Sequence, residues 1–204
     1  MIGYGLLALM GYLFGCSNLA WSLAKLRGFD IHAKGSNNAG ASNAAITMGL
    51  NTGMAVALHD IAKSYAAALL AGLLFPHLTY GAVVAGVAAV LGHIFPFYLC
   101  FRGGKGFASF LGLTLAVDWR FFLAIVLAVL LITLVTDYIV LGTITTVISF
   151  PAYLFFRQLP LITIALVCVA SLVILCKHAV NIRRLYTGQE IGLRRTLSRK
   201  DRVS

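Results

Sequence analysis

The feature that most constrains this chain is a succession of long apolar runs separated by short polar segments. A helix needs about 20 predominantly apolar residues to cross the hydrocarbon core of a bilayer. Hydrophobic residues make up 60% of the chain and charged residues only 11%, whereas a soluble domain carries roughly a quarter charged residues. We therefore expect the 204 residues to form one polytopic membrane domain over 1–204, without a sizeable aqueous domain.

The apolar runs predict an all-α integral membrane protein with seven transmembrane helices. The runs are Ile2–Leu23, Thr52–Phe75, Leu78–Phe101, Phe107–Val117, Phe121–Val135, Tyr138–Phe156 and Leu161–Cys176. The fourth run is short, because a helix over Phe107–Val117 rises only about 17 Å against a core of about 30 Å. Joining it to the fifth run would bury Asp118 and Arg120 at about 3 kcal/mol per charge. We therefore expect a short fourth helix followed by a turn.

The placement of the cations predicts the orientation of the helices. With seven crossings, thirteen of the sixteen Lys and Arg residues fall on one side of the membrane. Positive charge gathers in cytoplasmic loops, so we expect the N-terminus outside and the C-terminus in the cytoplasm. The segment 187–204 is then a basic cytoplasmic tail that contacts anionic membrane lipids. The net charge of +10 is explained by topology, and we expect no nucleic-acid partner.

Three polar segments on the predicted cytoplasmic side contain the candidate site residues. The first, Gly35–Asn43, combines two glycines with hydroxyl and amide side chains. Such a sequence is typical of a turn with a helix N-cap. It is equally typical of a loop whose backbone N–H groups approach an anionic oxygen. Both interpretations stay open for this segment alone.

The second segment, Gly92–Gly106, ends in a glycine-rich loop with a lysine just before a helix. Exposed N–H groups, a helix N-terminus and a point cation together favour phosphate, and Gly103, Gly104, Lys105 and Gly106 would supply them. The loop lacks the GxxxxGK[ST] pattern of a Walker A motif. Pro96 is expected to kink the end of the third helix and turn this loop back toward the helices.

The third segment, Lys177–Glu190, places His178 and Asn181 on one helix face at i, i+3 spacing. A basic helix end at the membrane surface would also explain part of this pattern. Within the second apolar run, Asp60 and Lys63 are ionisable residues, which mark functional sites by default in a membrane helix. They also have the spacing to neutralise each other.

Several chemistries have no counterpart in this sequence. It contains no GxSxG nucleophile elbow, no HExxH and no cysteine–histidine cluster with metal-ligand spacing. We therefore expect no metal and no cofactor. Phosphate-binding loops on one membrane face, without a nucleophile, suggest an enzyme that joins a charged small substrate to a lipidic one.

The three segments together resemble the signatures of the bacterial acyl-phosphate:glycerol-3-phosphate acyltransferases, the PlsY family. The sequences GSNNAGASN, GHIFPFYLCFRGGKGFAS and KHAVNIRRLYTGQE match family motifs of the form GSGNPGATN, GHxFPxFLxFxGGKGxAT and KHxxNxxRLLxGxE. The resemblance covers nearly the whole chain. It implies transfer of a fatty acyl group from acyl phosphate to the sn-1 hydroxyl of glycerol 3-phosphate, which yields lysophosphatidic acid and phosphate for phospholipid biosynthesis.

The resemblance also implies roles for individual residues. The expected catalytic residues are Ser36, His93, Lys105, His178 and Asn181. The expected substrate-binding residues are Gly35, Asn38, Gly40, Asn43, Gly103, Gly104 and Gly106. Glu190, Asp60 and Lys63 are expected to be structural. The implied location is the bacterial plasma (inner) membrane with a cytoplasmic active site, and a further implied partner is the enzyme that makes acyl phosphate.

The chain departs from the family pattern at a few positions. Ile46 stands where the family usually has an arginine, and Val180 stands where the third motif usually has an acidic residue. The loss of the arginine removes a cation suited to bidentate phosphate binding. Two alternatives follow: a related acyltransferase with another acceptor, or a transporter or channel for a phosphorylated metabolite that uses the Asp60 and Lys63 pair.

Overall fold

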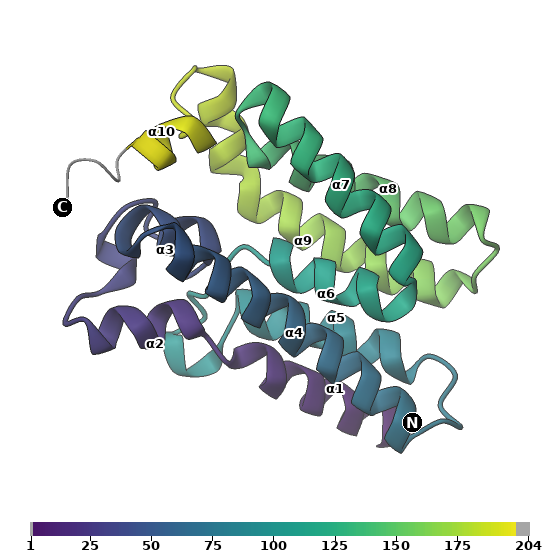
Figure 1. Cartoon of the computed structure of the whole chain (residues 1–204). Helices are drawn as coiled ribbons and strands as arrows, with labels where there is room; N and C mark the ends of the chain where they lie inside the picture. Colours follow the sequence, from purple (N-terminus) through teal and green to yellow (C-terminus); the bar gives the residue numbers. More distant parts are fainter. Residues whose placement is uncertain (1, 199–204) are drawn as a thin grey trace. The chain divides into compact units, whose positions relative to one another are not determined.

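The helices of the chain follow the apolar runs. The computed structural model describes residues 2–198, and Figure 1 shows a chain built of helices joined by short loops. Among the described residues, six helical segments are long and apolar enough to cross a membrane. Helix α6 (Phe107–Val117), with 11 residues, is apolar but shorter. The all-helical architecture is confirmed, whereas the count of seven crossings and the orientation of the termini stay predictions.

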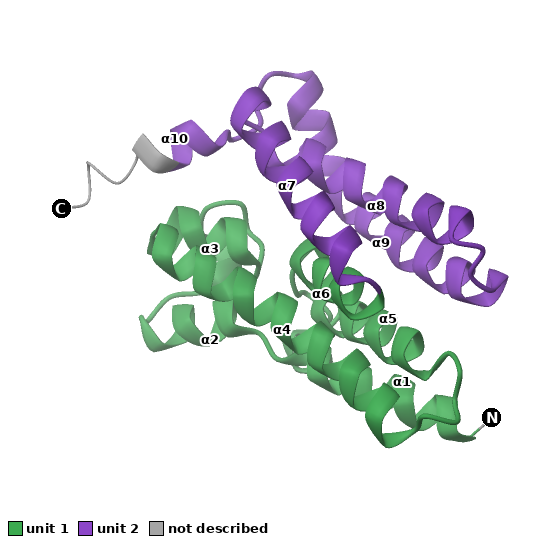
Figure 2. Cartoon of the chain, turned by 45° about the vertical axis from the view of Figure 1, so that its right-hand side comes forward, with its two compact units in different colours: residues 1–117 green, residues 118–204 purple. Residues whose placement is uncertain are grey.

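The chain forms two compact units, residues 1–117 and 118–204 (Figure 2). Unit 1 contains the first and second polar segments, and unit 2 contains the third. A single membrane domain over the whole chain stays a prediction. The predicted turn after the fourth helix is present, since α6 ends at Val117 and the next helix begins at Trp119.

Unit 1 is built on close contacts between helices that small residues permit. Its helical elements are α1 (Ile2–Cys16), α2 (Leu19–Leu26), η1 (Ile31–Ala33), α3 (Ala41–Met48), α4 (Leu50–Leu74), α5 (Gly81–Ile94), η2 (Phe97–Leu99) and α6. Helix α1 packs along α5, and α4 packs against both α5 and α6. A side chain at Gly11 or Gly15 would overlap with the α5 backbone at Ala85 or Ala89. This spacing of small residues four apart lets two helix backbones approach closely in a membrane.

Two predicted helices of unit 1 differ from the structure. The first apolar run is not one helix, because Ser17 and Asn18 separate α1 from α2. The Asn18 side chain accepts a hydrogen bond from the Trp21 amide at 2.8 Å and thereby caps α2. The third helix was expected to continue to Phe101 with a kink at Pro96, but α5 ends at Ile94. Proline disfavours helical geometry in the residue before it, so the chain leaves the helix instead of bending it.

Unit 2 contains helices α7 (Trp119–Thr136), α8 (Ile139–Phe156), α9 (Leu161–Tyr186) and α10 (Leu193–Ser198). Helix α8 packs against both α7 and α9. Phe121 of α7 stacks on Phe150 and Tyr153 of α8, with ring centroids 5.2 and 4.5 Å apart. Such aromatic pairs add stability beyond the apolar area that they bury.

The last long helix extends farther than the apolar run predicts. It continues past Cys176 to Tyr186, so that the start of the third segment is helical. The short helix α10 follows, and Asp137 at the end of α7 accepts a 2.7 Å hydrogen bond from the Arg194 amide. The predicted basic tail begins within this region, and its residues 199–204 lie outside the described residues.

Candidate active site

The first polar segment forms a loop between η1 and α3, and the side chain of Asn43 organises it. Asn43 is 1% exposed. Its amide nitrogen donates to the carbonyl oxygens of Ile31 and Lys34 at 2.9 and 3.0 Å, and its Oδ1 accepts from the Ser36 amide at 2.7 Å. These three bonds occupy the polar atoms of Asn43 with loop backbone, which fixes the loop shape.

After Ser36, the first loop places the side chain of Asn38 beside the N-terminus of α3. Gly40 is the N-cap residue of α3 and its side-chain position faces Asn38. The Oδ1 atom of Asn38 is buried and has no hydrogen-bond partner among the described residues. A buried polar atom without a partner is uncommon. An amide that has this atom unused, next to the N–H groups that begin α3, can bind a polar ligand.

The second segment folds back onto the helix that precedes it. Cys100 and Phe101 have φ values of 50° and 59°, which lie in the left-handed region that non-glycine residues rarely adopt. This turn brings the Gly103 amide to the Ile94 carbonyl oxygen at 3.1 Å and the Gly104 amide to the His93 carbonyl oxygen at 3.0 Å. The sequence suggested that both amides contact phosphate. In this structure backbone carbonyl oxygens accept from both amides, and substrate binding by Gly103 and Gly104 stays a prediction.

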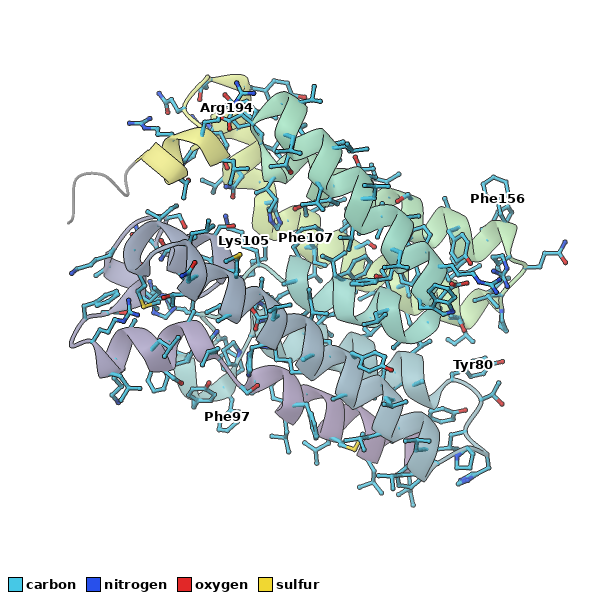
Figure 3. The ribbon with its side chains drawn as sticks, viewed as in Figure 1. Tyr80, Phe97, Lys105, Phe107, Phe156 and Arg194 are labelled. Atoms are coloured by element: carbon cyan, nitrogen blue, oxygen red, sulfur yellow. The ribbon has the colours of Figure 1, made fainter. Side chains whose placement is uncertain are left out.

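The first and second segments lie side by side. A side chain at Gly40 would stand 3.8 Å from the Gly104 Cα atom. Farther along the loops, His32 Nε2 and the Arg102 carbonyl oxygen are 2.6 Å apart. The segments that lead into α3 after Gly40 and into α6 after Gly106 therefore lie close together. Figure 3 shows Lys105 just before α6 begins at Phe107. Backbone N–H groups of the two first turns together with a lysine favour an anion.

A buried polar cluster lies next to the loop of Gly103–Gly106, which it contacts through His93. Asp60 and Lys63 of α4 and His93 of α5 are 2%, 6% and 3% exposed. Lys63 Nζ lies 2.8 Å from Asp60 Oδ1 and 2.9 Å from His93 Nδ1. The pair of Asp60 and Lys63 is thus present as predicted, and it contacts His93 of the second motif. A buried ion pair within a membrane helix marks a functional region.

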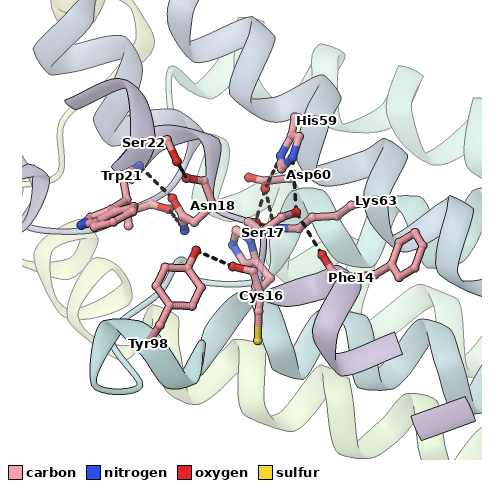
Figure 4. A network of polar contacts seen from close by, with 12 residues as sticks. Phe14, Cys16, Ser17, Asn18, Trp21, Ser22, His59, Asp60, Lys63 and Tyr98 are labelled. Carbon is pink, nitrogen blue, oxygen red and sulfur yellow. Dashed lines mark hydrogen bonds and ion pairs between the residues drawn. The ribbon is translucent and has the colours of Figure 1, made fainter. Parts of the chain in front are cut away.

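The break between α1 and α2 supplies further partners to this cluster (Figure 4). The Ser17 carbonyl oxygen accepts from Lys63 Nζ at 2.6 Å, and the Cys16 carbonyl oxygen accepts from the Tyr98 hydroxyl at 2.8 Å. Asn18 Nδ2 donates to the Ala39 carbonyl oxygen at 3.0 Å. The break therefore connects the buried cluster to the first loop. The apolar runs alone do not indicate this role, although a Ser-Asn pair within an apolar run is itself a helix-breaking signal.

The third segment lies on unit 2. His178 is 7% exposed and its Nδ1 lies 2.9 Å from the Ile174 carbonyl oxygen. Because a carbonyl oxygen only accepts, Nδ1 carries the proton. Asn181 Nδ2 donates to Glu190 Oε1 at 2.6 Å, which closes the turn after α9. Glu190 thus contacts Asn181 directly, and its structural role stays a prediction.

The predicted site residues form two groups. Unit 1 brings together the first loop with Gly35, Ser36, Asn38 and Gly40, the second loop with Gly103, Gly104, Lys105 and Gly106, and His93 with Asp60 and Lys63. Unit 2 brings together Asn181 and Glu190, with His178 one helical turn before Asn181. Asn43 lies in the first turn of α3, and its side chain bonds to the backbone of the first loop.

Comparisons with known proteins identify the family of this chain. The sequence profile of the glycerol-3-phosphate acyltransferase family matches residues 5–188. Glycerol-3-phosphate acyltransferase 1 of Oceanobacillus iheyensis is 34% identical over 206 residues, covering 97% of this chain and 98% of its own. The enzyme of Mesorhizobium japonicum is 37% identical over 190 residues, covering 92% and 95%.

Two solved structures are also similar over nearly the whole chain. Both are crystal structures of PlsY (YgiH), an integral membrane glycerol 3-phosphate acyltransferase, and both are 34% identical to this chain. The glycerol 3-phosphate form has a TM-score of 0.87 over 93% of this chain and 95% of its own. The lysophosphatidic acid form has a TM-score of 0.83 over 93% and 94%. Sequence, fold and site together show that the chain belongs to the glycerol-3-phosphate acyltransferase family of integral membrane enzymes.

Proposed function

We propose that this enzyme transfers a fatty acyl group from acyl phosphate to the sn-1 hydroxyl of glycerol 3-phosphate. The hydroxyl oxygen attacks the acyl carbonyl carbon, the bond from that carbon to the phosphate oxygen breaks, and the departing phosphate takes the hydroxyl proton. The products are lysophosphatidic acid and inorganic phosphate. The observation that carries the proposal is the approach of Gly40 to Gly104. This approach supports one anion-binding region that would use Lys105 and the N–H groups at the starts of α3 and α6.

The donor already has a good leaving group, so the protein needs to supply orientation and charge neutralisation more than a nucleophile. Lys105 and the first turns of α3 and α6 would hold a phosphate group. Ser36 and the unpartnered Oδ1 of Asn38 would contact the polyol. Asn43 acts by positioning the loop, because its polar atoms are bonded to loop backbone. His178 and Asn181, from the third motif, are the further candidate catalytic residues.

The proposed setting is the bacterial inner membrane with seven crossings, an external N-terminus and a cytoplasmic active site. The charge distribution supports this, since thirteen of sixteen cations fall on one side under that topology. The neighbouring positions of the first and second loops in unit 1 agree with a common side for both. Acyl phosphate is water-labile and lipidic, so an enzyme that makes it is the natural partner.

Ile46 suggests a second candidate acceptor. This residue lies on α3, within the helix whose N-terminus borders the site, and it replaces the arginine usual in the family. With one cation fewer, the site would bind a doubly charged phosphate less tightly. The alternative is therefore an acyltransferase with another acceptor, and a panel of phosphorylated polyols tests it.

The test is product analysis with the purified full-length enzyme in detergent. Phosphate release from acyl phosphate should require glycerol 3-phosphate, and mass spectrometry should detect lysophosphatidic acid. Lys105→Ala and Ser36→Ala should abolish the reaction, whereas Lys25→Ala should not, since Lys25 contacts the Trp21 ring at 4.9 Å in α2. Equal activity of wild type and both site variants would refute the assignment. Preference for another phosphorylated polyol would identify the alternative acceptor.

A further inference from the structure

Lys63 uses all of its donor capacity on three fixed acceptors. Its ammonium has three N–H groups and no acceptor. The three acceptors within 2.9 Å are the Ser17 carbonyl oxygen at 2.6 Å, Asp60 Oδ1 at 2.8 Å and His93 Nδ1 at 2.9 Å. They come from the helix break, from α4 and from α5, so three elements fix the position of the ammonium.

This contact determines which nitrogen of His93 carries the proton. Because the ammonium only donates, Nδ1 must accept, and the ring is neutral with its proton on Nε2. The alternative is a proton on Nδ1 that donates to Asp60. The separation of Nδ1 and Asp60 Oδ1 is 3.3 Å, longer than the 2.9 Å to Lys63. The shorter contact favours the Nε2–H form.

The protonated edge of His93 faces the glycine loop. A side chain at Gly104 would overlap with the ring, and the first atom that it would meet is Nε2. The polar contacts of this ring within the described residues are made through Nδ1. Because Gly104 has no side chain, His93 Nε2 can lie against the loop that precedes Lys105.

We infer that Asp60 and Lys63 are positioning residues that hold His93 as a neutral imidazole, so that its Nε2–H donates to a phosphate oxygen of a bound substrate beside Gly104 and Lys105. The inference rests on the proposed function and adds a role to two residues that the sequence assigned only to structure. The phosphate can belong to glycerol 3-phosphate or to acyl phosphate, which share this chemistry. A neutral donor also adds no further positive charge to a buried cluster in which Asp60 and Lys63 already balance.

The simpler interpretation is that Asp60 and Lys63 only neutralise each other. It predicts that an apolar pair would serve equally well, since replacing a buried ion pair with apolar residues is often tolerated. Positioning predicts a loss of function even when the fold is kept, because partners that orient a functional histidine typically contribute about 10- to 100-fold.

The direct test is nitrogen NMR of the full-length enzyme labelled with ¹⁵N-histidine in detergent micelles. The spectrum of His93→Gln identifies the His93 signals among those of the five histidines. We expect Nδ1 to resonate as an unprotonated ring nitrogen and Nε2 as an N–H. A proton on Nδ1 overturns the inference. This measurement needs no activity, so it decides the tautomer even if the proposed acyl transfer fails in wild type.

Kinetics test the role of the pair. The double variant Asp60→Leu with Lys63→Met should lower kcat/KM by about 10- to 100-fold with little change in helix content. In the His93→Gln background, the same double substitution should lower kcat/KM by less than about threefold. A glutamine amide donates a hydrogen bond without a tautomer that a neighbour must control. A double variant with wild-type kcat and KM for both substrates overturns the inference. If it does not fold, Lys63→Arg keeps the charge but changes the donor geometry, and the same loss is expected.

The substrate varied in the assay identifies the phosphate concerned. A rise in KM for glycerol 3-phosphate alone assigns the His93 contact to the acceptor, and a rise in KM for acyl phosphate alone assigns it to the donor. A fall in kcat without either rise assigns the contact to the phosphate oxygen on which charge develops as the acyl bond breaks. Each pattern supports the positioning role.

Discussion

The side chain of Asn43 lies within the loop that presents Ser36, and its Oδ1 accepts a 2.7 Å hydrogen bond from the Ser36 amide. We predict that Asn43→Ala lowers stability by about 2–4 kcal/mol, since three hydrogen bonds of about 1 kcal/mol each are lost and buried loop groups become unpaired. Thermal unfolding in detergent measures this effect. Asn51→Ala, at an exposed position of α4, is the control and should change stability by less than about 0.5 kcal/mol.

An acidic variant at the same position separates the donor contacts from the acceptor contact. Asn43→Asp keeps an oxygen for the Ser36 amide but removes the N–H groups that donate to Ile31 and Lys34. We expect intermediate stability and a raised KM for glycerol 3-phosphate. If Asn43→Asp and Asn43→Ala both leave KM unchanged, Asn43 does not position the loop.

Gly104 is expected to tolerate no side chain, because a Cβ atom there would overlap with the His93 ring. Gly104→Ala should move the loop or the ring and reduce kcat/KM by more than about tenfold, as small displacements at a reacting centre do. Gly5→Ala is the matched control, since a side chain at Gly5 meets nothing within 4 Å. That substitution should stabilise α1 by about 0.5–1 kcal/mol and leave the rate unchanged. Equal rates for the two variants would contradict the close packing of His93 on Gly104.

Asp118 should make the stability of the enzyme depend on acid pH. Hydrogen bonding from the Tyr153 hydroxyl, and then from the Arg120 and Phe121 amides that begin α7, holds the pKa of Asp118 below its ordinary value of 3.8. The stabilisation is therefore fully present above the ordinary pKa and is lost as pH falls through the lower pKa of the folded state.

The measurement is the unfolding temperature of wild type and Asp118→Asn between about pH 6 and pH 3. The advantage of wild type should be constant in the upper part of this range and should shrink near its acid end. An advantage that does not change with pH would show that the Asp118 charge contributes nothing to stability. Phe121→Leu alters the same contact region but keeps Asp118, so its difference in unfolding temperature from wild type should stay constant across this pH range.

Ile46→Arg should restore the cation that the family usually has on this helix. We expect the KM for glycerol 3-phosphate to fall by about tenfold, since a charge-assisted hydrogen bond contributes about 1.5–3 kcal/mol. Ile46→Leu, which keeps the apolar character, should leave KM unchanged. If Ile46→Arg leaves the KM for glycerol 3-phosphate unchanged and raises that for another phosphorylated polyol, the alternative acceptor is favoured.

Asp137 should determine whether α10 stays against the end of α7. Its Oδ1 accepts from the Arg194 amide at 2.7 Å and its carbonyl oxygen accepts from the Leu193 amide at 2.8 Å. Asp137→Ala removes the first bond and places alanine at a φ of 73°, which asparagine tolerates better. We expect faster tryptic cleavage at Arg194 for Asp137→Ala than for Asp137→Asn. Equal cleavage of both variants would exclude this role.

The helices were predictable because apolar periodicity and length are local properties of the sequence. The seven apolar runs correspond to helices, and the short helix Phe107–Val117 has the predicted bounds. The three polar segments were identifiable because their residue types have few other uses within an apolar chain. The Ser-Asn break at residues 17 and 18 was missed, because apolar length outweighed capping signals. The i, i+3 spacing of His178 and Asn181 indicated a helix in the third segment, but the apolar run alone did not predict that α9 continues to Tyr186.

The sequence by itself determined the all-helical membrane architecture and the identity of the polar segments. The tertiary structure decided how individual polar atoms are used. In the folded chain the Gly103 and Gly104 amides donate to backbone carbonyls, and the Asn43 side chain bonds to the preceding loop. Ser17, Lys63 and His93 lie within hydrogen-bond distance of one another through the Lys63 ammonium. The physical reason is that a helix depends on residues four positions apart in the sequence. The hydrogen-bond partners of Lys63 are 30 and 46 positions away, at His93 and Ser17, and only the packing of the helices brings them together.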